Sequence, residues 1–180
     1  MSNLTTPARA VAAALARRGW NRWIGADDGV VVAQAASLAA IAWPGGPRWR
    51  LGPAGATVAG AALAGGAALA VAAGAGHGSH LTPRVEPPDG APLLTTGPYA
   101  VSRHPLYAGL LLGTAGWAVL RRRPEPLLAW GALLGVLLAK TRREEERLAE
   151  RYGRAYEEYR ALTPRLLGMP GGDVGPRTHR

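Results

Sequence analysis

Two groups of polar side chains in this sequence are candidates for a functional role, and each lies at the edge of an apolar segment. Tyr99, Arg103 and His104 can donate hydrogen bonds, and they lead directly into an uncharged stretch. Glu144 and Glu145, which can accept hydrogen bonds, follow another uncharged stretch. The chain contains no cysteine, which excludes thiolate nucleophiles, disulfides and cysteine-ligated metals.

The segment between the two groups of polar side chains could bring them together in space. Residues 105–120 and 125–140 are both apolar, and the short basic turn 121–123 joins them. A hairpin of two helices in a bilayer returns the chain to the side that it left. We therefore expect His104 and Glu144, which are far apart in sequence, to lie next to each other.

The composition predicts packed helices. The 180 residues are 48% hydrophobic but only 6% aromatic, and this fits both a soluble helical bundle and a membrane protein. Charges are almost absent from four segments, about 29–43, 51–76, 105–120 and 125–140, which favours membrane spans. The prediction is an all-α, polytopic membrane bundle of about four transmembrane helices. Three segments are shorter than the roughly 20 residues that cross a bilayer, so local thinning or arginine side chains that reach the headgroups must make up the difference.

The basic residues are distributed unequally between the two sides of such a bundle. With four spans, sixteen lysine and arginine residues fall on the side of the two termini and of the loop before residue 105, and five fall on the other side. This bias predicts an integral, multi-pass protein of the cell (plasma) membrane whose termini and polar groups face the cytoplasm. Because the basic residues follow the membrane borders, we expect no nucleic-acid partner despite the net charge of +9.

The ends of the chain differ from its middle. Residues 1–28 are polar and basic, with Trp20 and Trp23 placed where aromatic residues lie at a membrane interface, and they predict an interfacial segment. Residues 168–180, rich in glycine, proline and arginine, predict a disordered tail. Residues 29–167 then form one membrane domain.

Two further patterns concern helices. Small residues at steps of about four within 51–76 would let helix backbones approach closely in lipid, but for any single glycine we prefer the interpretation that it only belongs to an alanine-rich helix. Residues 141–160 predict a C-terminal amphipathic cytosolic helix that ends before Pro164. One face of this helix would carry Glu144, Leu148, Tyr152, Tyr156 and Tyr159, and the three tyrosines are expected to pack against the interface.

The two polar groups together resemble a known family. Gly97-Pro98-Tyr99 and Arg103-His104-Pro105-Leu106-Tyr107-Ala108-Gly109, followed by Glu144-Glu145, Leu148, Tyr152-Gly153, Tyr156, Tyr159 and Pro164-Arg165, are similar to the isoprenylcysteine carboxyl methyltransferase family and its phospholipid N-methyltransferase relatives. The resemblance covers roughly residues 77–167. It implies an integral membrane enzyme that binds S-adenosylmethionine at the cytosolic end of its last helices, without a Rossmann fold.

The resemblance also implies the cofactor-binding residues, which are Tyr99, Arg103, His104, Tyr107, Gly109, Glu144 and Glu145. The carboxylates would accept hydrogen bonds from ribose hydroxyls or the ammonium group, while tyrosine, arginine and histidine would donate to the methionine carboxylate or ribose. Tyr107 would pack on the adenine, and Gly109 would leave room for the cofactor or for a neighbouring helix. Arg103 and Arg143 are candidates for positioning, and no residue is assigned a catalytic role.

The acceptor implied by the resemblance is a carboxylate or amine of a lipophilic small molecule or lipid. A carboxylate needs no general base, whereas an amine must lose a proton, for which a glutamate or His104 is the candidate.

We expect no metal, because His77 and His80 lack a third ligand. Sterol and steroid reductases, which use NADPH, carry a similar Arg-His-Pro-x-Tyr block, but Leu110 after Gly109 favours methyl transfer. A catalytically silent membrane scaffold is the third alternative.

Overall fold

The computed structural model describes residues 26–77 and 92–168, and within them it contains five α-helices and no strand. The helices are α2 (Ala26–Ala42), α3 (Pro53–His77), α4 (Pro105–Leu120), α5 (Pro124–Tyr152) and α6 (Arg154–Leu162), with a short 3-10 helix, η3 (Gly97–Ala100). The prediction of an all-α chain is confirmed. Most of the predicted interfacial segment 1–28, the side chains of His77 and His80 and nearly all of the tail lie outside the described residues.

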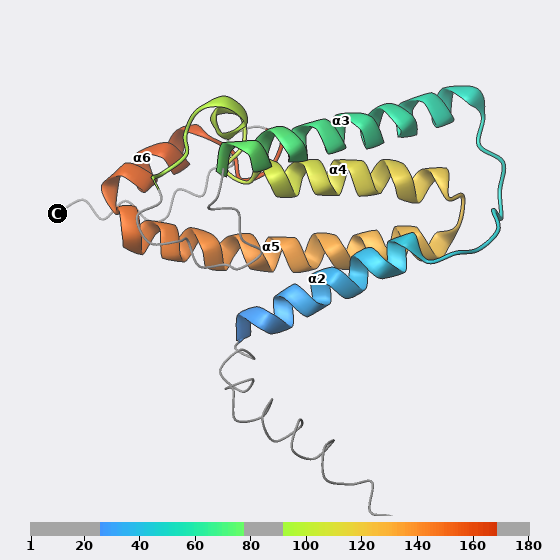
Figure 1. Cartoon of the computed structure of the whole chain (residues 1–180), viewed down its shortest axis with the longest axis horizontal. Helices are drawn as coiled ribbons and strands as arrows, with labels where there is room; N and C mark the ends of the chain where they lie inside the picture. The colour runs from blue at the N-terminus through green and yellow to red at the C-terminus, as the bar shows by residue number, and fades with distance from the viewer. Residues whose placement is uncertain (1–25, 78–91, 169–180) are drawn as a thin grey trace, which may run out of the picture.

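Four long helices lie side by side, and helices that follow each other in the chain run in opposite directions (Figure 1). Helix α4 lies between α3 and α5, and α2 packs on α5. The buried core between α2, α4 and α5 consists of Ile41, Leu111, Leu133 and Leu137. Trp130 also links α5 to α4, since its indole N–H donates to the carbonyl of Leu111 at 2.9 Å. The antiparallel order places the end of α3, the start of α4 and the second half of α5 at one end of the bundle.

Glycines on both helices allow α3 and α4 to pack at very short range. A Cβ atom added at Gly109 would lie 2.6 Å from the backbone nitrogen of Ala70 and 2.6 Å from the carbonyl oxygen of Gly66. Gly116 faces the backbone of Ala59 in the same way. The structure shows the close approach that small residues allow, and at Gly66 it corrects the preferred interpretation that a single glycine of this segment has no packing role. Of the two roles expected for Gly109, the structure shows the contact with a neighbouring helix.

The predicted separate helix at 141–160 is wrong. Helix α5 continues without a break from the apolar segment through the charged residues to Tyr152, because nothing between 139 and 152 interrupts a helix. The break comes at Gly153, whose φ of 53° is a left-handed conformation that favours glycine. Tyr156 and Tyr159 therefore lie on α6, a different helix from Glu144.

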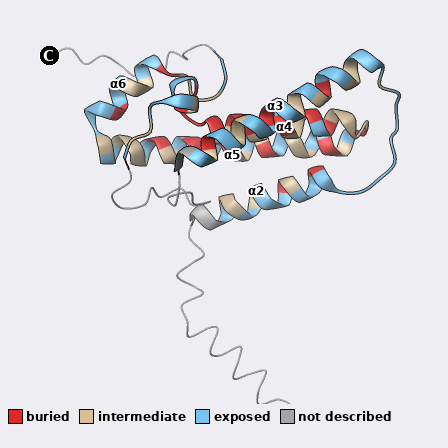
Figure 2. Ribbon diagram, turned by 45° about the horizontal axis from the view of Figure 1, so that its top comes forward, coloured by how far each residue is buried: buried red, intermediate tan, exposed pale blue. Residues whose placement is uncertain are grey.

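By length and composition, one described helix is able to cross a membrane, namely Pro53–Ala75 within α3. The apolar stretches Gly29–Ala42 and Pro105–Leu120 are shorter. Large apolar side chains are nevertheless exposed on the outside of the bundle, among them Val32, Val58, Val71 and Leu128 (Figure 2). The bundle of four spans stays a prediction.

The basic turn 121–123 lies at the end of the bundle opposite His104, and it contacts the segment that connects α2 to α3. The guanidinium of Arg121 donates to the carbonyls of Trp43 and Gly45 at 3.2 and 3.3 Å. Arg48 forms an ion pair with Glu125 at 2.7 Å. The turn 121–123 is therefore bound to the connection between α2 and α3.

Candidate functional site

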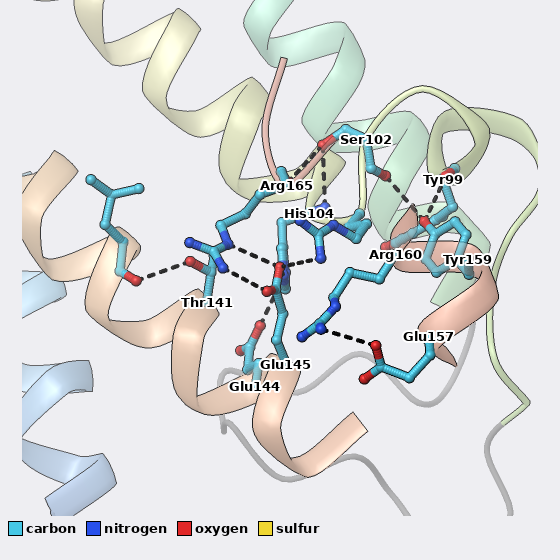
Figure 3. Close-up of polar contacts among 12 residues, drawn as sticks. Tyr99, Ser102, His104, Thr141, Glu144, Glu145, Glu157, Tyr159, Arg160 and Arg165 are labelled. Atoms are coloured by element: carbon cyan, nitrogen blue, oxygen red, sulfur yellow. Dashed lines mark hydrogen bonds and ion pairs between the residues drawn. The ribbon is translucent and has the colours of Figure 1, made fainter. Parts of the chain in front are cut away.

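Five parts of the chain meet at one end of the bundle: η3, the start of α4, the second half of α5, α6 and the segment 163–168 (Figures 1 and 3). Gly97 opens η3 with a φ of 60°, which favours glycine. Pro105 occupies the first turn of α4, where its missing N–H costs no helical hydrogen bond. His104, immediately before this proline, is thereby held at the edge of the bundle and pointed toward α5.

The segment 99–104 is fastened from two directions. The hydroxyl of Tyr159 donates to the carbonyl of Tyr99 at 2.6 Å, so α6 holds η3. The backbone N–H of Arg103 donates to the carbonyl of Pro164 at 2.8 Å. The backbone N–H of His104 donates to the carbonyl of Arg165 at 3.1 Å. These bonds fix the backbone from which Arg103 and His104 project.

His104 lies between two carboxylates, as the hairpin argument predicted. Its Nδ1 is 3.3 Å from Oε2 of Glu144, and its Nε2 is 3.2 Å from Oε1 of Glu145, which is 41 positions away in sequence (Figure 3). The Tyr107 hydroxyl donates to the other oxygen of Glu144 at 2.6 Å. Burial lowers the pKa of His104, but the bonds to Glu144 and Glu145 outweigh burial and raise it above its ordinary value of 6.5.

Glu145 is the most heavily paired carboxylate of the cluster. Arg165 donates to both of its oxygens, from Nε at 3.0 Å and from Nη2 at 2.8 Å, and Nη1 of Arg103 lies 3.3 Å from one of them. Burial works against its ionisation, but hydrogen bonds from His104 and Arg165 outweigh burial and lower the pKa of Glu145 to about 2. Glu145 is therefore ionised and neutralised from three sides.

The remaining predicted residues take different positions. Tyr99 is buried, and its hydroxyl donates to the Ala73 carbonyl at 3.5 Å, at the end of α3. Tyr107, expected to pack on an adenine, has its ring stacked on His104 at 5.8 Å and has Nζ of Lys140 5.0 Å from its ring centre. Arg143 lies on α5 and is partly exposed. The structure thus brings His104, Tyr107 and both glutamates into direct contact.

Sequence reasoning did not assign two residues that the structure places in or beside the cluster. The first is Arg165, which belongs to the motifs of the family resemblance but has no role predicted from the sequence. Lys140, which is 1% exposed, donates to the side-chain oxygen of Gln34 at 3.1 Å and so links α5 to α2. The available signal was a lysine at the end of an apolar segment, where a charged group needs a partner.

A model of the phospholipid methyltransferase family matches residues 56–155, which is more than half of the chain. The chain belongs to the phospholipid methyltransferase family. Methyltransferases of this family are associated with membranes and act on lipid-like substrates. No curated protein and no solved structure is significantly similar to the chain.

The family match contains both polar groups but not the residues that support them from the C-terminal end of the chain. It includes η3, α4 and α5, and so it contains His104, Tyr107 and both glutamates. It ends before Tyr159 and Arg165. The match favours a methyltransferase over the reductase alternative. The side chains that support the cluster from α6 and the segment 163–168 are contributed by a part of the chain beyond the matched region.

Proposed function

We propose that this member of the phospholipid methyltransferase family transfers a methyl group from S-adenosylmethionine to a carboxylate or amine of a lipophilic small molecule or lipid, at the cytosolic face of the membrane. The observation that carries this proposal is the contact of His104 with Glu144 and Glu145. It joins the two polar blocks of the family match in one buried cluster at the end of the helices.

The residues of the cluster fit the polar groups of S-adenosylmethionine. Arg103 is buried, and its Nη1 faces Oε1 of Glu145 at 3.3 Å, whereas its Nε has no hydrogen-bond partner, so Nε is a donor that suits a carboxylate. The Glu144 side chain is 14% exposed, compared with 4% for Glu145, and its oxygens suit an ammonium group or ribose hydroxyls. S-adenosylmethionine, when bound, supplies a methyl group activated by the adjacent sulfonium. Arg103 and Glu144 would hold its methionine or ribose part, with His104 between them.

Proton transfer in this site would fall to Glu144. Because a carboxylate oxygen faces each ring nitrogen of His104, both contacts are satisfied only by the cationic imidazole, which has no lone pair for a proton. Glu145 is neutralised by two arginines and is equally unsuitable as a base. A carboxylate acceptor needs no base, whereas an amine acceptor would give its proton to Glu144, with the Tyr107 hydroxyl holding that side chain.

We further propose that α2, α3, α4 and the first half of α5 span the plasma membrane, with both termini in the cytoplasm and residues 29–167 forming one domain. The exposed apolar side chains on the outer faces of the bundle support contact with lipid. Because the chain has no native cysteine, single cysteines report topology directly. Glu146→Cys should react with a membrane-impermeant maleimide from the cytoplasmic side, and Gly46→Cys from the opposite side. Reaction of both from the same side contradicts the four spans.

Calorimetric titration of the detergent-purified protein tests the cofactor. We expect saturable binding of S-adenosylmethionine and S-adenosylhomocysteine but not of NADPH. Binding of NADPH alone would establish the reductase alternative, and binding of none of the three would leave a silent scaffold.

The same titration tests the site. His104→Ala and Glu144→Ala should each weaken S-adenosylmethionine binding at least about tenfold, because each removes a group that would contact or orient the cofactor. Glu146→Ala is the matched control, since Glu146 is the next residue of α5 but is exposed. Equal affinity of His104→Ala, Glu144→Ala and the control removes these residues from the site.

A further inference from the structure

The segment that follows α6 passes directly under the cluster. After α6 ends at Leu162, the chain turns back, and the carbonyls of Pro164 and Arg165 accept the backbone N–H groups of Arg103 and His104. The hydroxyl of Ser102 also donates to the Arg165 carbonyl at 3.2 Å. These contacts place the Arg165 side chain beside Glu145 (Figure 3). Arg165 is thus connected to the site through both its backbone and its side chain.

The Arg165 side chain differs from the other arginine at Glu145 in geometry. Arg165 donates from two nitrogens to two different oxygens, which fixes the plane of the carboxylate. Arg103 approaches one oxygen at 3.3 Å, and its Nη1 makes no hydrogen bond. The oxygen that receives Nε of Arg165, Oε1, is also the one that faces Nε2 of His104. The orientation of this oxygen toward the imidazole is therefore set by Arg165.

We propose that Arg165 is a positioning residue of the methyltransferase site, which holds Glu145 so that the carboxylate fixes the imidazole of His104 between Glu145 and Glu144. This inference rests on the proposed function only for its effect on cofactor binding. The contact itself lies outside the region of the family match and connects the C-terminal segment to the start of α4.

Several charged or titratable groups surround the cluster, and the test must separate Arg165 from them. Glu144 and Glu145 face His104 from α5, and Tyr107 stacks on it from α4. Farther from the imidazole lie Arg103, Lys140 above the Tyr107 ring, the buried Tyr99 and Tyr156, and the partly buried Tyr159. Arg160 on α6 pairs with Glu157 at 2.9 Å and serves as a matched control arginine.

The first measurement is the pKa of His104 by NMR titration of the full chain in detergent micelles. The chain has four histidines, and the His104 signal is assigned by its loss in His104→Gln. Arg165→Ala removes a positive charge from Glu145, which then acts more strongly on the imidazolium, so the pKa of His104 should rise by about one unit. Arg165→Lys keeps the charge but loses the two-point contact, so Glu145 is held less firmly toward the imidazole and the pKa of His104 should fall below the wild-type value.

Arg160→Ala should leave the pKa of His104 as in the wild type. If Arg165→Ala does not fold, Arg165→Gln keeps one hydrogen bond without the charge and should show the same rise. A pKa of His104 in the folded Arg165→Lys variant that matches Arg160→Ala would overturn the proposal.

The second measurement is the affinity for S-adenosylmethionine. We expect about a tenfold loss in Arg165→Ala, about a threefold loss in Arg165→Lys, which keeps charge but not the two-point contact, and no loss in Arg160→Ala. If the wild-type protein binds no S-adenosylmethionine, the proposed function fails, and the NMR titration still decides the role of Arg165. If the wild type binds but Arg165→Ala and Arg160→Ala give the same affinity and the same pKa of His104, the positioning role alone is refuted.

Discussion

Replacement of Gly109 by alanine tests whether the α3–α4 contact positions the start of α4. The added Cβ would lie 2.6 Å from the backbone nitrogen of Ala70 and from the carbonyl oxygen of Gly66. Ordinary contacts begin near 3.4 Å, so the two helices must move apart by about 0.8 Å. Both obstacles are backbone atoms, which cannot rotate away as a side chain can. Overpacking of this kind costs about 1–3 kcal/mol.

A matched control exists on α5. Gly135 is exposed, and a Cβ there would meet nothing within 4 Å. Gly135→Ala should therefore leave the free energy of unfolding unchanged or raise it by up to about 1 kcal/mol through helix propensity. Both substitutions add the same methyl group in the middle of a helix, so the difference between them isolates the helix contact.

The assay is unfolding of each variant by sodium dodecyl sulfate in mixed micelles, followed by circular dichroism. We expect Gly109→Ala to lower the free energy of unfolding by about 1–3 kcal/mol relative to Gly135→Ala. Gly109 lies just over one turn after His104, so a displaced α4 should also weaken binding of S-adenosylmethionine. Equal stability of the two variants would refute the argument that backbone contact between α3 and α4 is rigid.

Three further predictions concern the cluster. The pKa of Glu145 is about 2 in the folded protein, below its value in the unfolded chain, so the stability that Glu145 contributes is lost as the pH falls below about 4.3. The pKa of His104 is raised in the folded protein, so the stability that His104 contributes is lost as the pH rises above about 6.5. The thermal midpoint should therefore be highest between these pH values, and a profile that is flat from pH 3 to 9 contradicts this assignment. Glu145→Gln should lower the free energy of unfolding by about 3–5 kcal/mol because it leaves the buried Arg103 and the partly buried Arg165 without a carboxylate, whereas Glu144→Gln should cost clearly less. Similar losses of the two variants in chemical denaturation would show that the two carboxylates are equivalent. Tyr159→Phe removes the 2.6 Å hydrogen bond to the Tyr99 carbonyl and should cost about 1 kcal/mol, and unchanged stability in the same assay would mean that α6 does not hold η3.

Errors in the helix boundaries came from using charge as a boundary signal. The sequence changes from apolar to charged near Lys140, and the prediction places the end of one helix and the start of another at this change. A helix does not end where its surroundings change, because its backbone hydrogen bonds do not depend on the polarity of the side chains. The actual break at Gly153 has a backbone cause, a left-handed φ.

The meeting of His104 with Glu144 was determined by the sequence itself. Two apolar segments of similar length joined by a short turn form an antiparallel pair of helices. The residue before the first helix and the residue after the second then lie at the same end of the pair. The close α3–α4 contact was also visible in the sequence as a run of small residues, since only such residues let helix backbones approach so closely. The resemblance to membrane methyltransferases rested on the motifs around His104 and Glu144, and the family match confirmed it.

Only the tertiary structure decided which groups complete the cluster. Arg165 reaches Glu145 because the chain reverses at Gly153 and again after Leu162, and Lys140 reaches Gln34 because α2 packs on α5 and not on another helix. Neither contact has a spacing in the sequence that marks it. Local patterns determine helices and hairpins through short-range geometry, whereas contacts between distant segments depend on the combined path of every turn between them.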